Sequence, residues 1–173
     1  MLILNISDDD LTYKQSKWLL EYARVVGCDR FSFDIEIKEN DVAIKYQHSL
    51  LEQLQPFSLG SENAEIIVTY NREPSIRRQN MWALTNESIQ IILKHMGRNL
   101  LDNMLAENEG ISGWRIYKKN EKKVHVSAVY GFDYFFFVEP PSGLINRLGD
   151  SAKFALITNK NNGVAEPKLN PEC

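Results

Sequence analysis

The residues best suited to chemistry lie in one short alternating segment, where Asp34 is followed by Glu36 and Lys38. Side chains two positions apart on a β-strand point to the same face, so such a strand presents two carboxylates and an amine together. Carboxylates bind divalent cations, and a neighbouring lysine stabilises an attacking water or a developing negative charge. The spacing is therefore a hypothesis for a hydrolytic metal site.

The acidic-x-lysine pair resembles part of the metal site of PD-(D/E)xK-type nucleases. That resemblance implies magnesium-dependent cleavage with Asp34, Glu36 and Lys38 in the site. In such a site a further aspartate comes from an adjacent strand, whereas Asp34 shares the strand and Asp29 is too near to belong to a hairpin partner. The competing interpretation is the solvated polar face of a two-sided sheet. We adopt it, and expect no catalytic residue, metal or cofactor.

A second set of residues is suited to binding a protein: four carboxylates and one aromatic residue, namely Asp8, Asp9, Asp34, Glu36 and Tyr134. The carboxylates would face a basic surface of the partner. Tyr134 belongs to the aromatic run of residues 130–137, which places large rings on both faces of an ideal strand. Such a strand is either covered on both sides or committed to a partner, where aromatic residues often dominate the binding energy.

Two basic clusters bear on a possible nucleic-acid partner. One contains arginines near a tryptophan (Arg72, Arg77, Arg78 and Trp82), and the other contains lysines at a hairpin tip (Lys118, Lys119, Lys122 and Lys123). Such residues contact phosphates and stack on bases. The chain carries a net charge of −3, however, and lysines at a turn commonly keep it solvated. Nucleic acid is therefore not the expected partner.

The composition is that of an ordinary globular chain: 173 residues, 43% hydrophobic and 25% charged. It excludes collagen-like, low-complexity and wholly disordered classes. The beginning of the sequence has no signal-peptide pattern, and no apolar run approaches the roughly 20 residues that span a bilayer. Cys28 and Cys173 do not form a disulfide framework. We expect a cytoplasmic protein that does not contact membrane.

Hydrophobic periodicity predicts the elements of the first half of the chain. Residues 2–6 form a strand, and residues 8–10 are aspartates that favour the start of the helix that follows. That helix carries an apolar stripe (Leu11, Trp18, Leu19, Tyr22 and Val26) and ends at Gly27. Alternation predicts a hairpin of residues 31–37 and 42–46. A short helix at 48–55 and a strand at 65–70 follow.

The second half continues with a weak preference for a strand in residues 71–84. A long helix begins after Thr85 or Asn86 and carries apolar residues as far as Leu105. A second hairpin joins residues 114–117 to 124–130, and further strands are expected at 132–138 and 154–157. Residues 158–173 are polar and rich in asparagine and proline, which predicts a flexible tail.

These elements predict an α+β fold, with one mostly antiparallel sheet of five to seven strands and two main helices packed on one face. Residues 1–157 form a single domain, and residues 158–173 form the tail. In size and charge the chain resembles bacterial toxin-neutralising immunity proteins. The leading hypothesis is thus a non-enzymatic cytoplasmic inhibitor that binds and occludes another protein. The alternatives are the metal-dependent nuclease and a small-molecule-binding domain with a pocket between the sheet and the long helix.

Overall fold

A computed structural model describes residues 2–7, 12–36, 41–66, 75–96, 110–129, 134–138, 154–160 and 163–164. Its helices are α1 (Tyr13–Val25), α2 (Asp41–Leu54) and α3 (Asn86–His95), with a 3-10 turn η2 (Gln55–Phe57). Its strands are β1 (Leu2–Ser7), β2 (Cys28–Ile35), β3 (Ser58–Ile66), β4 (Ser75–Ala83), β5 (Ile111–Lys118), β6 (Val124–Val129), β7 (Tyr134–Val138), β8 (Phe154–Lys160) and β9 (Gly163–Val164).

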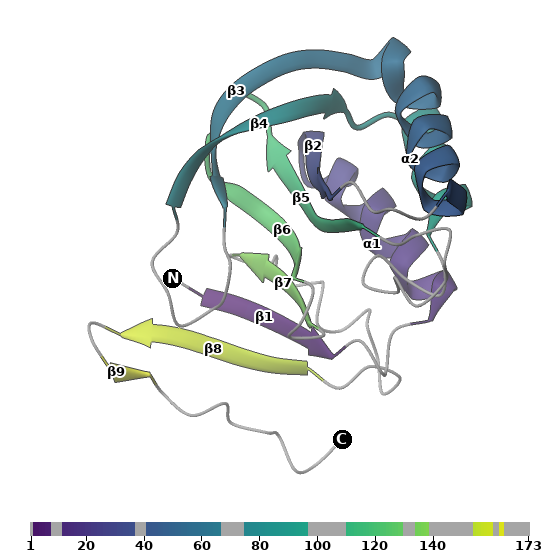
Figure 1. Cartoon of the computed structure of the whole chain (residues 1–173). Helices are drawn as coiled ribbons and strands as arrows, with labels where there is room; N and C mark the ends of the chain where they lie inside the picture. Colours follow the sequence, from purple (N-terminus) through teal and green to yellow (C-terminus); the bar gives the residue numbers. More distant parts are fainter. Residues whose placement is uncertain are drawn as a thin grey trace.

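The strands join in the order β3-β4-β2-β5-β6-β7-β1-β8-β9 (Figure 1). Every described pairing is antiparallel. The expected α+β class and single antiparallel sheet are therefore confirmed. Five of the strands, β3-β4-β2-β5-β6, carry most of the described side chains and hold both the core and the candidate site.

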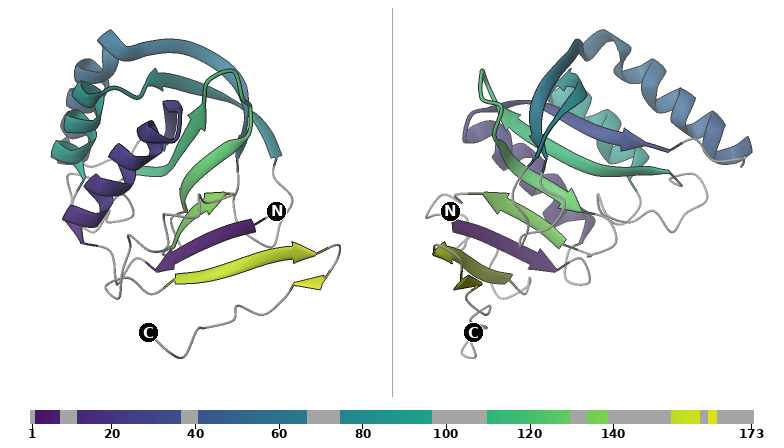
Figure 2. Two further views of the ribbon diagram at one scale, coloured as in Figure 1. Left: turned by 180° about the vertical axis from the view of Figure 1, so that it is seen from behind. Right: turned by 60° about the vertical axis from the view of Figure 1, so that its left-hand side comes forward.

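This five-strand region is strongly curled. Figures 1 and 2 show β3 and β4 arching over β5 and β6. The backbone N–H of Glu65 on β3 donates to the carbonyl of Lys122, in the turn between β5 and β6, at 2.8 Å. The curl gives the sheet an inner face, which closes on itself, and an outer face, which the helices cover.

An aromatic stack forms the centre of the outer face. The Phe33 ring lies 4.5 Å from that of Trp82 and 4.6 Å from that of Trp114, measured between ring centroids, and Phe31 packs beside them. Helices α1, α2 and α3 all contribute to this core, through Leu19, Leu20, Ala23, Leu50, Leu54, Ile89, Ile92 and Leu93. Each large side chain fully buried here contributes about 1.5–3 kcal/mol relative to exposure.

The hairpin expected at residues 31–37 and 42–46 is wrong. Residues 41–54 form helix α2, and β2 pairs with β4 and β5 instead. The alternation of Val42, Ile44 and Tyr46 covers only three positions. The longer buried series Ala43, Gln47, Leu50 and Leu54 has helical spacing, and it decides the structure.

Helices α1 and α3 both begin with a threonine cap. In α1, Thr12 Oγ1 accepts from the Gln15 N–H, and Gln15 Oε1 accepts from the Thr12 N–H. The expectation that residues 8–10 cap this helix is therefore wrong, because the capping box places the start at Tyr13. In α3, Thr85 and Ser88 bond in the same reciprocal way, as the expected start at Thr85 requires.

Helix α3 is described as far as His95, and residues 97–109 lie outside the described part. His95 is buried against α2, with its ring 4.8 Å from that of Tyr46 and its Nδ1 2.9 Å from the Ile91 carbonyl. Burial lowers the pKa of His95 below its ordinary value.

Several other elements agree with the sequence analysis. Residues 75–83 form strand β4, as weakly expected, and the hairpin of β5 and β6 is confirmed. Strand β8 runs to Lys160, so the boundary expected at residue 158 falls inside it, and residues 165–173 lie outside the described part. Within the described residues, no helix has the length and apolar character needed to cross a bilayer.

Candidate functional site

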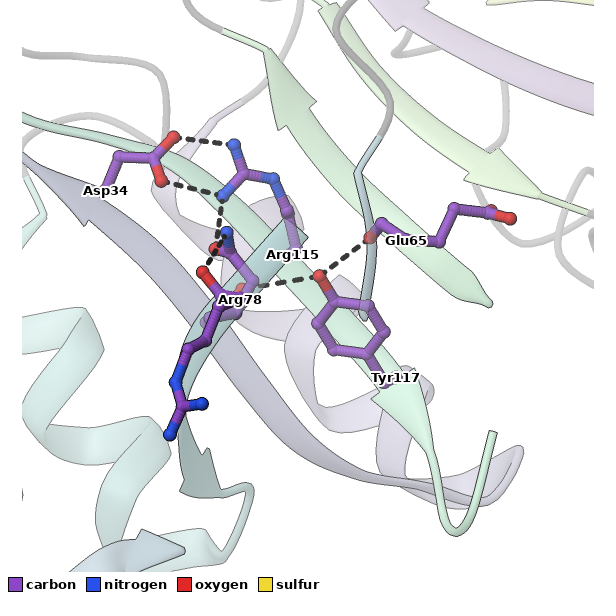
Figure 3. A network of polar contacts seen from close by, with 7 residues as sticks. Asp34, Glu65, Arg78, Arg115 and Tyr117 are labelled. Atoms are coloured by element: carbon purple, nitrogen blue, oxygen red, sulfur yellow. Dashed lines mark hydrogen bonds and ion pairs between the residues drawn. The ribbon is translucent and has the colours of Figure 1, made fainter. Parts of the chain in front are cut away.

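An ion pair between Asp34 and Arg115 is the centre of the inner face (Figure 3). The guanidinium of Arg115 donates from Nη1 to Asp34 Oδ1 at 3.0 Å and from Nη2 to Asp34 Oδ2 at 2.6 Å. Nη1 also donates to Gln79 Oε1 at 3.1 Å. The Arg115 side chain is 7% exposed, whereas that of Asp34 is 51% exposed. A buried arginine thus holds a half-exposed carboxylate by two bonds, the geometry that most restricts both groups.

The backbone around Gly113 makes this pair possible. Ser32 is opposite Arg115, but Asp34 is opposite Ser112, so the register shifts by one residue beside the pair. Gly113 has φ +62°, a conformation that favours glycine. A Cβ added to Gly113 would lie 2.5 Å from Asp34 Oδ2 and 2.9 Å from Arg115 Nη2. Glycine is therefore required here both for its backbone and for the space that the ion pair occupies.

Tyr117 lies two residues further along the same face of β5 and is fully buried. Its hydroxyl donates to the Glu65 carbonyl at 2.9 Å and lies 3.4 Å from Ser32 Oγ. Burial raises the pKa of Tyr117, so its side chain stays a neutral phenol whose hydroxyl donates a hydrogen bond. Tyr117 thereby ties the edge strand β3 to the middle of the sheet.

A second charged group closes the curl near the turn between β5 and β6. Arg30 Nη1 contacts Glu62 Oε1 at 2.7 Å, and Arg30 Nη2 donates to the Glu121 carbonyl at 2.7 Å. The Glu121 carboxylate lies 2.8 Å from His125 Nε2, and this hydrogen bond lowers the pKa of Glu121. With the Glu65–Lys122 backbone bond, these contacts fix the turn against β3.

The proposed nuclease residues are not brought together as a metal site in the described part of the chain. Both oxygens of Asp34 accept hydrogen bonds from Arg115. Glu36 follows the end of β2, where its backbone N–H donates to the Gly110 carbonyl and its own carbonyl accepts from Gln47 Nε2. Lys38 lies outside the described residues. Among those residues, no group of three histidine, cysteine, aspartate or glutamate side chains has metal-binding geometry.

Of the residues expected to bind a partner, Asp34 and Glu36 are exposed at the end of β2. Asp8 and Asp9 lie outside the described residues. Tyr134 begins β7, opposite Ser7 of β1 and Val129 of β6, and its side chain is outside the described set. Of the five expected residues, the structure thus describes the side chains of two, and both are exposed near the end of β2.

The arginine–tryptophan cluster does not have the arrangement of a base-stacking site. Arg77 and Arg78 are consecutive on β4, so their side chains lie on opposite faces of the strand. Trp82 is only 7% exposed and packs in the aromatic core. Arg72 lies outside the described residues. At the hairpin tip, Lys119 and Lys122 are exposed, as expected of a solvated turn.

Sequence reasoning missed Arg115, Gln79 and Tyr117. The signal was present in the segment 114–117, where Trp114 and Ile116 alternate with Arg115 and Tyr117. A strand with aromatic or aliphatic residues on one side and an arginine and a tyrosine on the other indicates a polar network on the second face. The inner face was instead expected to be solvated, yet Ser32 is fully buried there.

No protein-family model, no curated protein and no solved structure matches this chain.

Proposed function

We infer that this chain is a non-enzymatic, cytoplasmic interaction protein that binds and occludes another protein, as an inhibitor or an immunity protein does. The observation that carries the proposal is the Asp34–Arg115 pair. Arg115 is buried and holds Asp34 from inside the sheet, while half of the Asp34 side chain faces solvent. A carboxylate fixed before binding loses less conformational entropy when a partner contacts it.

The surroundings of Asp34 favour a basic partner. Glu36 and Asp41 follow it in sequence and are both exposed. Arg115 is turned inward and is 7% exposed, so the surface at the end of β2 presents carboxylates to solvent. Complementary charge steers association and selects among partners more than it adds affinity. The partner surface would therefore carry lysine or arginine side chains.

The test uses the whole protein as tagged bait in a lysate of its own host. Asp34→Asn combined with Glu36→Gln removes two charges, and Glu52→Gln removes one exposed charge on α2 as the matched control. Retained proteins are identified, purified and titrated against each variant by calorimetry. We expect one basic protein to bind the wild type and the control alike, and to bind the double variant at least several-fold more weakly.

Unchanged unfolding midpoints of the three baits establish that the variants are folded. Equal binding by the double variant and the wild type would contradict the proposal. So would a magnesium-dependent nuclease activity of the wild type that the Asp34→Asn change removes, because the nuclease hypothesis would then account for Asp34.

A further inference from the structure

The structure shows which backbone N–H and C=O groups of β3 point away from the sheet at its outer edge. Strand β3 begins the order of the sheet, and among the described strands it pairs with β4 alone. The N–H of Glu65 donates to the Lys122 carbonyl and its C=O accepts from the Tyr117 hydroxyl, so both groups point away from β4. In an antiparallel ladder the backbone groups of alternate residues point to the same edge. The N–H and C=O groups of Ser61 and Asn63 therefore also point outward.

The accessible part of this edge is short and bounded at both ends. At one end a register shift between Ser58 and Gly60 forms a bulge, and Gly60 has φ +82°. At the other end the turn between β5 and β6 covers Glu65. Within the described residues, no backbone bond joins the outward groups of Ser61 or Asn63 to another strand. Both residues are exposed, so two pairing positions remain at the surface.

We propose that this edge binds an extended segment of a partner protein that carries a lysine or arginine opposite Glu62. An added antiparallel strand would exchange backbone hydrogen bonds with Ser61 and Asn63. Glu62 would then occupy the intervening position without hydrogen bonds, where opposite side chains lie closest. The Glu62 side chain is 40% exposed and its Oε1 is buried against Arg30, so a cation opposite Glu62 would extend the charged row that Arg30 and Glu62 begin.

A second copy of this chain is a poorer occupant of the edge. The twofold arrangement that uses both pairing positions places Ser61 of one copy opposite Asn63 of the other. Glu62 then faces its own counterpart, and like charges directly opposite each other destabilise a pair of strands. Charge complementarity thus favours a basic segment of another protein.

This surface is distinct from Asp34, and the two proposals can fail separately. The probe is a pentapeptide of alternating threonine and valine with lysine at its centre, blocked at both ends, and the control peptide has glutamate there. In nitrogen-15 NMR titrations of the whole protein, we expect the lysine peptide to shift the amides of Ser61 and Asn63. The glutamate peptide should bind several-fold more weakly. Asp34→Asn should leave these shifts unchanged.

Glu62→Lys should reverse the preference, so that the glutamate peptide binds better. Asn63→Pro should abolish binding while the protein stays folded, because it removes an N–H that points outward and takes no bond from β4. Absence of shifts at Ser61 and Asn63, or equal binding of both peptides that Glu62→Lys does not change, would overturn the proposal. Shifts that depend on protein concentration without peptide would also overturn it, in favour of a second copy.

Discussion

The two faces of the curled sheet are built from the same strands and differ in kind. On the outer face, Phe31 and Phe33 of β2 stack with two tryptophans beneath three helices. On the inner face, Ser32 and Asp34 of the same strand contact Tyr117 and Arg115. The outer face is stabilised by the burial of apolar surface, and the hydrophobic effect has no preferred direction. The inner face combines a small apolar cluster (Ala64, Met81, Tyr117 and Val124) with a few oriented bonds, each of which can be broken separately.

Burial arises in a different way on each face of the sheet. The outer face is buried because helices that carry apolar stripes cover it. The inner face is buried because the sheet bends until β3 reaches the turn between β5 and β6. Polar groups enclosed in this way must be hydrogen-bonded, since an unpaired buried group costs about 1–3 kcal/mol. The Nη groups of Arg115 and the hydroxyl of Tyr117 meet that requirement, whereas Arg115 Nε and Ser127 Oγ are buried without a hydrogen-bond partner in the described part of the chain.

The largest effect is expected from Phe33→Ala on the outer face. Removing a buried ring between Trp82 and Trp114 should lower the free energy of unfolding by about 3–5 kcal/mol. Ser32→Ala is the matched change on the inner face, and it should lower the free energy by only about 1 kcal/mol. Urea denaturation of both variants measures the comparison. Equal losses would show that the two faces contribute alike.

Asp34→Ala tests the ion pair itself. Removing one partner of a fully buried pair typically costs about 3–5 kcal/mol, because the other charge is left uncompensated. Asp34 is half exposed and Arg115 keeps its bond to Gln79, so we expect about 2 kcal/mol in urea denaturation. Adding Arg115→Met should recover part of this loss. A double variant less stable than Asp34→Ala would mean that Arg115 stabilises the fold without its carboxylate.

Gly113→Ala tests whether the backbone of β5 makes room for the pair. A residue other than glycine at positive φ costs about 1–2 kcal/mol, and here the added Cβ would also meet the two charged groups. Gly60→Ala is the control, since Gly60 has φ +82° but a Cβ there meets nothing within 4 Å. Thermal unfolding should show a larger loss for Gly113→Ala. Equal losses would assign the whole effect to backbone strain.

Much of the outer face and little of the inner one could be predicted from the sequence. The alternation of Phe31 and Phe33 with Ser32 and Asp34 correctly separates the faces of β2. It does not show that the polar side is enclosed, because closure depends on a bond between Glu65 and Lys122, far apart in sequence. The ion pair could not be predicted for the same reason, because its two members are 81 residues apart in the sequence.

Acid titration should distinguish the helix layer from the turn that closes the inner face. Burial lowers the pKa of His95, so below its ordinary value of 6.5 the unfolded chain binds a proton more readily and stability falls as the pH drops. The hydrogen bond from His125 lowers the pKa of Glu121, so the contribution of Glu121 to stability is present above the ordinary pKa of 4.5 and is lost as the pH falls through the lowered value.

Urea denaturation from pH 8 to 3 should therefore show two successive losses of stability. His95→Gln should remove the first and Glu121→Gln the second, while His48→Gln, a change at an exposed residue of α2, should leave both in place. A first loss that survives His95→Gln would assign it to a group outside the helix layer.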